Sequence, residues 1–364
     1  MSMTILRGAR ALAAALALGA FALAAHAADG ASGLAYVSNQ NGDVSVIDLA
    51  TMAVSGKVSA YGKEPRGIGV TADGKLLVVA NREGGRVAVI DRASGKLLRQ
   101  VTIGSNPEFV RTRGHMAFVS FEPSSTGQAP PREGAKEAAK DAPEAKEDDE
   151  KNEPARVAVV DLDSGKVVRS IEGGLETEGI EFAADGRHIL VTNEADDNIT
   201  VHEIASGKKV RTIDIKPWGD RPRGIKMAPD GKSYVATLEH GNAFIVLDAK
   251  YKVIKSVKTG ESPYGVSFDR AGKRLFVAAA RSKLLQVFDA RTYAPIKDVL
   301  TGNRCWHFSF TPDDKSILLA CGRSHEVLVI DAKTLERVQR IPDAQLPWGI
   351  VTYPKSMGSL DQPE

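Results

Sequence analysis

The sequence is poor in cysteine and in aromatic residues, and neither sign of charge predominates in it. Only two of the 364 residues are cysteine, and Phe, Trp and Tyr together make up 6% of the chain. So few cysteines exclude a small protein built on a disulfide framework, and 43% hydrophobic residues exclude a wholly disordered chain. The only long apolar run lies at the N-terminus, which excludes a polytopic membrane protein. The chain is long enough for one large globular domain or two ordinary ones.

Residues 1–27 have the pattern of a secretory signal peptide. Arg7 and Arg10 precede an apolar stretch of 14 residues, Ala11–Ala24, and Ala25-His26-Ala27 supplies a cleavage site of small residues. A stretch of this length is short for a bilayer span, so an uncleaved anchor is the weaker alternative. We expect the segment to be removed, leaving a monomeric periplasmic protein that is not attached to the membrane.

Without that segment the chain carries 46 basic and 46 acidic residues. A protein without net charge lacks the electrostatic field that gathers polyanions, which argues against nucleic acid as a partner. We therefore expect the partner to be a small molecule or another periplasmic protein.

A short phrase recurs along the chain, in which alternating apolar residues are followed by an acidic residue and a turn. The seven copies are Val44–Asp48, Val87–Asp91, Val157–Asp161, Ile199–Glu203, Phe244–Asp248, Leu285–Asp289 and Leu328–Asp331. Their acidic ends stand 43, 70, 42, 45, 41 and 42 positions apart. Each copy belongs to a unit of four short runs with period-two alternation, separated by turn residues, and no stretch has sustained helical periodicity. Seven such units predict an all-β, seven-bladed β-propeller of four-stranded antiparallel blades.

The two ends of the chain are expected to complete one blade together. Leu34–Asn39 aligns with the second strand of the other units, and the missing innermost strand is supplied by Pro347–Val351. The propeller is therefore expected to span residues 33–354. Residues 355–364 follow as a flexible tail.

The anomalous spacing of 70 is explained by an insertion in the third blade. Residues 123–155 contain five prolines, five basic and nine acidic residues and almost no large apolar side chain. Such a segment buries too little apolar surface to offset the entropy of ordering it, so we predict a disordered charged loop. A lid or a docking arm is the alternative.

Three segments give the chain a resemblance to a known group of propellers. Tyr36-Val37-Ser38-Asn39, Val79-Ala80-Asn81 and Val191-Thr192-Asn193, with the Pro-x-Gly-Ile motifs, resemble the YVTN-type seven-bladed propellers over nearly the whole mature chain. Within that group the chain is most similar to exported propellers associated with pyrroloquinoline quinone-dependent alcohol catabolism. It is also distantly similar to the haem d1-binding propeller of cytochrome cd1 nitrite reductase. The resemblance implies the fold strongly and the function weakly, because one fold hosts many chemistries.

The repeat alignment brings one position of every unit to the mouth of the central channel. This position lies at the start of the innermost strand and holds Arg66, Glu108, Glu178, Arg223, Tyr264, Trp306 and Trp348. In the resembling group the same positions carry a similar mixture, so we take these residues as a candidate ligand site. The arginines could clamp carboxylates while the aromatic rings stack on a planar ligand such as a quinone. In the alternative, Arg66 and Arg223 pair with Glu108 and Glu178, and the aromatic residues only fill the channel.

Two further side-chain types bear on chemistry. Cys305 and Cys321 flank a predicted hairpin at opposed positions, so they form either a disulfide or two buried thiols. His307 follows Trp306 at the mouth and joins the candidate ligand site, although a lone histidine is more often hydrogen-bonded than bound to a metal. No histidines have the spacing of metal ligands, and no nucleophile elbow is present.

We therefore predict no catalytic residues, no metal site and no obligatory cofactor, and the leading hypothesis is a non-catalytic exported propeller that binds a small molecule or a protein partner. Its role would be accessory to periplasmic oxidative, quinone-linked metabolism. The alternative is an enzyme, either a lactonase-like hydrolase or a redox protein with a non-covalently bound tetrapyrrole or quinone. His307, Glu108 and Glu178 would then supply acid–base chemistry.

Overall fold

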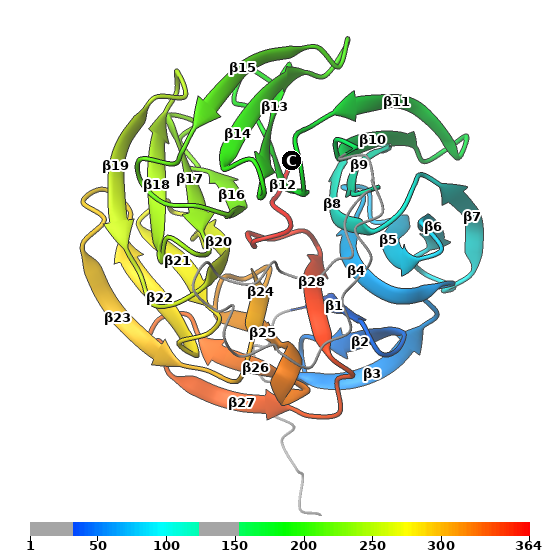
Figure 1. Ribbon diagram of the computed structural model, residues 1–364. Coiled ribbons are helices and arrows are strands. Elements are labelled where there is room, and N and C mark those ends of the chain that lie inside the picture. The colour runs from blue at the N-terminus through cyan, green and yellow to red at the C-terminus, as the bar shows by residue number, and fades with distance from the viewer. Residues whose placement is uncertain (1–31, 124–152) are drawn as a thin grey trace, which may run out of the picture.

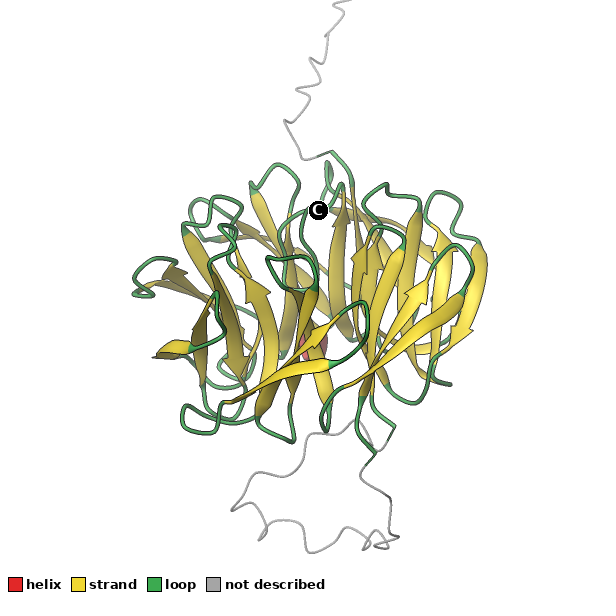
Figure 2. Cartoon of the chain, turned by 90° about the horizontal axis from the view of Figure 1, so that it is seen from above, coloured by secondary structure: helices red, strands yellow, loops and turns green. Residues whose placement is uncertain are grey.

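A computed structural model describes residues 32–123 and 153–364 of the chain. In these residues seven four-stranded antiparallel sheets radiate from a central axis (Figure 1), so the predicted seven-bladed propeller is confirmed. The strands run between two faces of the ring (Figure 2). The predicted signal peptide, and the insertion from residue 124 to 152, lie outside the described residues.

Each blade is numbered in chain order, and its strands run from the innermost to the outermost. Blades 1 to 3 are β28 (Pro347–Tyr353), β1 (Leu34–Asn39), β2 (Val44–Asp48), β3 (Ala53–Val58); β4 (Lys63–Val70), β5 (Leu76–Glu83), β6 (Arg86–Asp91), β7 (Leu97–Thr102); and β8 (Pro107–Arg113), β9 (Met116–Phe121), β10 (Arg156–Asp161), β11 (Lys166–Glu172). Blades 4 and 5 are β12 (Thr177–Phe182), β13 (His188–Asn193), β14 (Asn198–Glu203), β15 (Lys209–Asp214); and β16 (Pro222–Met227), β17 (Ser233–Leu238), β18 (Ala243–Asp248), β19 (Val253–Lys258). Blades 6 and 7 are β20 (Pro263–Phe268), β21 (Arg274–Ala279), β22 (Leu284–Asp289), β23 (Pro295–Leu300); and β24 (Cys305–Phe310), β25 (Ser316–Cys321), β26 (Glu326–Asp331), β27 (Arg337–Ile341), with the short 3-10 helix η1 (Gly322–Ser324).

The ring is closed by the pairing of the two chain ends. β28 lies antiparallel to β1, with Leu34 opposite Tyr353 and Tyr36 opposite Val351. Blade 1 therefore takes its innermost strand from the C-terminal part of the chain and its other three from the N-terminal part, as predicted. None of the helices in the described part of the chain is long and apolar enough to span a membrane.

The alternation of the repeat produces blades that are buried inside and exposed outside. The three inner strands of each blade are mostly buried, whereas the outermost strand is mostly exposed, as in β3. The acidic residue that ends each third strand starts the following turn: Asp48 Oδ1 accepts hydrogen bonds of 2.9 Å from the amides of Ala50 and Thr51. The same side chain-to-amide bonds form at Asp91, Asp161, Asp248, Asp289 and Asp331. The recurring acid is thus a turn-forming residue, because its carboxylate satisfies amides that no strand pairs.

Neighbouring blades come close together at their innermost strands. A Cβ atom at Gly179 or Gly224 would overlap the carbonyl oxygen of the next blade, which belongs to Arg223 or Tyr264. The second strand supplies a hydroxyl to the same oxygen: Thr192 Oγ1 donates to the Arg223 carbonyl at 2.7 Å. Equivalent bonds run from Thr237 to Tyr264, from Ser120 to Glu178 and from Ser38 to Arg66. In blades 1, 4 and 5 a glycine and a small hydroxyl residue therefore together fix the start of the following innermost strand.

Blade 7 contains the disulfide. Cys305 on β24 lies opposite Cys321 on β25, and their Sγ atoms are bonded. Both residues are buried, and 16 positions separate them. The bridge connects the first residue of β24 to the last residue of β25, at the end of the blade that faces the channel mouth.

The prediction of a flexible tail at residues 355–364 is wrong. The tail is packed inside the channel, where Ser356, Ser359, Leu360 and Asp361 are at most 5% exposed. Figure 1 shows this red segment running from β28 into the centre of the ring. The reason is non-local: buried cations of the channel wall donate hydrogen bonds to the tail, among them Lys226 to the Asp361 carbonyl at 2.8 Å.

Replacing both cysteines tests the contribution of the disulfide to stability. The double variant Cys305→Ala/Cys321→Ala is expected to remain folded but to lose about 3 kcal/mol of unfolding free energy, because a loop of this length is no longer closed in the unfolded chain. Denaturant unfolding of the oxidised unchanged chain and of the variant measures the difference. An unchanged midpoint would show that the bridge does not form in solution.

Candidate functional site

A cavity of about 460 Å³ occupies the channel mouth. All seven aligned residues that the repeat analysis selected line it, namely Arg66, Glu108, Glu178, Arg223, Tyr264, Trp306 and Trp348. They come from the innermost strands of seven different blades, so only the closed ring brings them together. His307, the eighth predicted residue, does not line the cavity and lies beneath its floor.

Other residues of the cavity wall were missed by the sequence analysis, although they too occupy fixed positions of the repeat. Two places before the aligned residue stand Glu176, Arg221, Arg304 and Leu346. All four have left-handed backbone conformations, with φ between 51° and 59°. Directly after the second strand stand Gln40, Glu122, Glu194 and Glu239. The sequence analysis aligned only the position of Arg66 and its equivalents. Aligning these two further positions of the repeat as well would have found eight of the nine missing residues. The ninth is Arg323 in η1.

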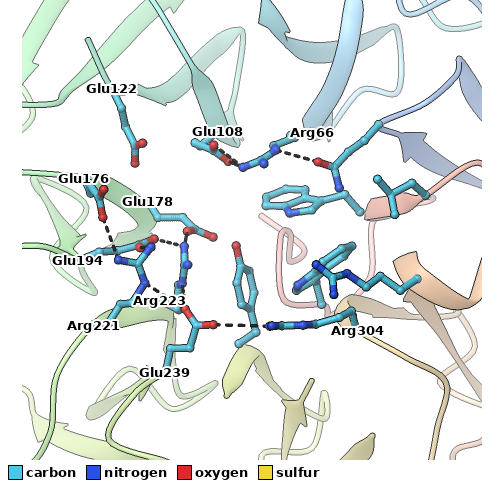
Figure 3. Close-up of a pocket in the computed structure, with 16 residues that line it drawn as sticks. Arg66, Glu108, Glu122, Glu176, Glu178, Glu194, Arg221, Arg223, Glu239 and Arg304 are labelled. Atoms are coloured by element: carbon cyan, nitrogen blue, oxygen red, sulfur yellow. Dashed lines mark hydrogen bonds and ion pairs between the residues drawn. The ribbon is translucent and has the colours of Figure 1, made fainter. Parts of the chain in front are cut away.

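The predicted arginines are already paired with glutamates from neighbouring blades. Both carboxylate oxygens of Glu108 accept hydrogen bonds from Arg66 Nη1 (Figure 3). Arg223 Nη1 contacts both Glu178 and Glu194, and its Nε lies 2.6 Å from Glu239 Oε2. The alternative anticipated from the sequence, internal pairing across the mouth, therefore describes Arg66 and Arg223.

Arg221 extends this charge network. Its guanidinium reaches Glu176 at 2.9 Å, Glu194 at 2.6 Å and Glu239 at 3.2 Å. Arg223 also lies over the Tyr264 ring, with 4.8 Å between the guanidinium carbon and the ring centre. Two arginines thus share four glutamates, and this side of the cavity holds its charges in fixed positions.

Glu178 and Glu194 are two buried carboxyl groups held by the same guanidinium group, that of Arg223. Burial raises the pKa of Glu194 well above its ordinary value, and the adjacent Glu178 carboxylate adds to the effect despite the attraction of Arg223. Burial acts in the same direction on Glu178, but Arg223 and hydrogen bonds from Glu194 and Tyr264 lower the pKa of Glu178 to about 2. The pKa values of the two carboxyl groups are therefore shifted in opposite directions, that of Glu194 upwards and that of Glu178 downwards.

The opposite side of the cavity is basic, and few carboxylates neutralise its positive charges. Arg304, which lies across the cavity from Glu122 and Glu176 in Figure 3, has one long contact of 3.8 Å with Glu239. The guanidinium of Arg323 makes no hydrogen bond or ion pair with any residue in the described parts of the chain. Burial, and the nearby guanidinium groups of Arg323 and Arg281, lower the pKa of Arg304. An anion bound here would relieve this crowding of positive charge.

The half-buried Trp306 lines the cavity together with the two arginines of the basic side. Its ring packs over Gly322, where any Cβ atom would overlap the indole. The disulfide joins Cys305, which lies between Arg304 and Trp306, to Cys321, which precedes Gly322 and Arg323. We name Arg304, Trp306 and Arg323 the basic wall, and the disulfide holds its two chain segments together.

The floor of the cavity consists of aromatic rings. Trp348 and Tyr264 line the cavity, and the His307 ring packs beneath, 4.3 Å from the Trp348 ring and 5.3 Å from the Tyr264 ring. His307 Nδ1 is hydrogen-bonded to Ser359 Oγ at 3.0 Å, and burial lowers the pKa of His307 to about 3. His307 is therefore a neutral, buried ring at physiological pH. Within the described ranges no cluster of three or more His, Cys, Asp or Glu side chains is arranged to hold a metal ion.

The raised pKa of Glu194 in the folded protein should make stability depend on pH, because a proton is bound there. Because the folded state holds this proton at pH values where the unfolded chain has released it, stability should fall as pH rises from about 5 towards the raised pKa, by up to about 1.4 kcal/mol per pH unit. Glu194→Gln keeps a hydrogen-bond donor without the titrating proton, so its stability should fall less. Thermal melting between pH 5 and 9 measures this, with exposed Glu336→Gln as control. Equal slopes of stability against pH for Glu194→Gln and the unchanged chain would contradict the raised pKa of Glu194.

Comparisons with known proteins support the architecture. The family model "YNCE-like beta-propeller" matches residues 10–117, and the model "Lactonase, 7-bladed beta-propeller" matches residues 156–250. Neither covers half of the chain, and no curated protein sequence matches it. The two matches agree with the seven blades of the structure.

Solved structures extend the likeness to most of the chain. A protein of unknown function from Desulfotomaculum acetoxidans DSM 771 superposes with a TM-score of 0.72 and 15% identity, covering 88% of this chain and 99% of that one. The periplasmic gluconolactonase PpgL of Pseudomonas aeruginosa superposes with a TM-score of 0.69 and 16% identity, covering 88% of this chain and 98% of that one. The dihydro-haem d1 dehydrogenase NirN, in complex with DHE, superposes with a TM-score of 0.61 and 18% identity, covering 88% of this chain and 75% of that one. At these identities the likeness establishes the fold, and the chain is a seven-bladed β-propeller similar to lactonase-type and haem d1-associated propellers.

Proposed function

We propose that this protein is an exported, non-catalytic propeller that binds an anionic, planar small molecule at the channel mouth. The single observation that carries the proposal is the basic wall. Arg304 and Arg323 have few internal partners and line, together with the half-buried Trp306, a cavity of about 460 Å³. A cavity of this volume is in the range that holds a cofactor-sized molecule.

The chemistry of the wall selects the ligand class. Two guanidinium groups recognise carboxylates through charge-assisted hydrogen bonds, and an indole ring in the same wall stacks on a flat ring system. The paired Arg66 and Arg223 are a different case, because a ligand could use them only by displacing Glu108 or Glu178. We therefore assign anion recognition to Arg304 and Arg323, and a supporting role to Arg66 and Arg223.

Quinone carboxylates and tetrapyrroles both satisfy this description. The likeness to the structure of the dihydro-haem d1 dehydrogenase NirN in complex with DHE supports a tetrapyrrole-type guest. The resemblance to the YVTN-type propellers associated with pyrroloquinoline quinone supports a quinone and a place in periplasmic oxidative metabolism. The signal-peptide pattern and the likeness to a periplasmic gluconolactonase support export.

Titration calorimetry with pyrroloquinoline quinone and with smaller aromatic carboxylates tests the site. Arg304→Ala and Arg323→Ala are each expected to weaken binding at least tenfold, because each removes a charge-assisted hydrogen bond of about 1.5–3 kcal/mol. Arg337→Ala, on the exposed strand β27, is the matched control and should bind like the unchanged chain. Retained affinity in the double variant Arg304→Ala/Arg323→Ala would remove the basic wall as the binding surface.

One observation favours an enzyme as the second candidate. Glu178 and Glu194 line the same cavity and their pKa values are shifted in opposite directions, which is the arrangement that general acid–base hydrolysis of a lactone needs. The two matched lactonase-type comparisons point the same way. The position of His307 beneath the floor argues against its use as a proton carrier.

A lactone panel separates the two candidates. If the protein only binds its guest, hydrolysis of six-membered sugar lactones should stay at the uncatalysed rate, in the unchanged chain and in Glu194→Gln alike. Hydrolysis above background that Glu194→Gln lowers at least a hundredfold would establish the enzyme instead. An absorbance spectrum of protein from its native host tests for a bound tetrapyrrole in parallel.

A further inference from the structure

The C-terminal segment occupies the half of the channel that lies opposite the mouth, as an extra strand-like element. Ser309 and Gly358 form an antiparallel β-bridge. The Phe310 amide donates to the Met357 carbonyl at 2.8 Å, and the Ser359 amide donates to the Phe308 carbonyl at 2.9 Å. The segment thus pairs with β24 through main-chain atoms, which is how proteins bind extended peptides.

The channel wall adds donors that are directed at main-chain oxygen atoms of the segment. Arg111 on β8 donates from Nη1 to the Leu360 carbonyl at 2.7 Å, and Lys226 on β16 donates from Nζ to the Asp361 carbonyl at 2.8 Å. Arg111 is 2% exposed and Lys226 is 0% exposed. Buried cations need acceptors, and Glu181, which contacts both, offers Lys226 an oxygen only at 3.9 Å. The wall therefore binds main-chain carbonyl groups of the segment, those of Leu360 and Asp361.

The Leu360 side chain anchors the segment, and the last residues of the segment lie at the open end of the channel. Leu360 is 1% exposed and packs in the cluster that contains Trp348 and Tyr264. The segment then turns back, with the Gly358 amide donating to the Asp361 carbonyl at 3.0 Å. It returns to the open end, where Glu364 is exposed and a cavity of about 300 Å³ adjoins the last residues. The C-terminus lies near the face uppermost in Figure 2.

We propose that this end of the channel is a peptide-binding site, which the chain's own residues 355–364 fill in this structure. Its ligand class is a segment that pairs with β24 through main-chain atoms and then turns, with small residues, a buried aliphatic side chain and a following acidic residue, as in Gly358–Asp361. The own segment is a tethered ligand, and a partner's segment of the same chemistry binds by displacing it. The site is independent of the anion proposed at the mouth, although Trp348 and His307 lie between the two.

The probe is a labelled synthetic peptide with the sequence of residues 355–364. In the full chain, Leu360→Asp places a charge in the apolar cluster and should release the tethered segment. The peptide should bind this variant at least tenfold more tightly than the unchanged chain, where the tethered copy competes at high effective concentration. A peptide that itself carries Leu360→Asp is the matched control and should not bind. Binding should also change the Trp348 fluorescence. Equal or absent binding to a folded variant would overturn the proposal.

Hydrogen exchange decides the question if Leu360→Asp does not fold. The amides of Gly358 and Ser359 belong to the segment, and the amide of Phe310 donates to it. In the unchanged full chain these three amides should exchange at least tenfold faster than the buried amides of β13. Such a difference would show that the segment opens while the propeller stays folded. Exchange of these amides only at the rate of global unfolding would show a permanent part of the core and would overturn the proposal.

Discussion

The structure depends on the close approach of innermost strands from neighbouring blades. At this contact the carbonyl group that begins one strand lies where a side chain of the previous strand would otherwise stand, and glycine leaves the space. A serine or threonine hydroxyl from the previous blade then bonds to that carbonyl group. Where glycine is replaced, as by Phe109 and His307, a large ring fills the channel instead. One contact therefore sets the blade spacing, the width of the channel and the position of every side chain at its mouth.

The charge pattern at the mouth follows from this fixed geometry. Residues at three offsets of each repeat are held within ion-pair distance of the next blade, so neighbouring blades with opposite charges neutralise each other. This is the case for Arg66 with Glu108 and for Arg223 with Glu178. The two neighbours of blade 7 have no acidic residue at these offsets, so Arg304 and Arg323 have few partners. Blade 6 has Ser262, Tyr264 and Ala280 there, and blade 1 has Leu346, Trp348 and Gln40. An arginine is thus made available by the identity of the neighbouring blade as much as by its own position.

The channel is divided into two compartments by one layer of rings. Trp348, Tyr264 and His307 separate the polar mouth from the half that the C-terminal segment occupies. Ser359 and Leu360 support that layer from the far side. The two ends of one channel can therefore carry unrelated recognition chemistry, one selecting charge and flat rings, the other selecting main-chain atoms.

The repeat period, the seven blades, the closure by the two chain ends and the ring of seven residues at the mouth were all contained in the sequence. Local alternation fixes which strand a residue belongs to, and a period of about 42 residues fixes its place in every blade. The pairing of Arg66 and Arg223, the burial of His307 and the docking of residues 355–364 were decided by the tertiary structure. Each of these depends on distances between groups far apart in the chain, such as Lys226 and Asp361, and a repeat pattern carries no information about such distances. The sequence determined which residues surround the axis, and folding decided which of them are satisfied by one another.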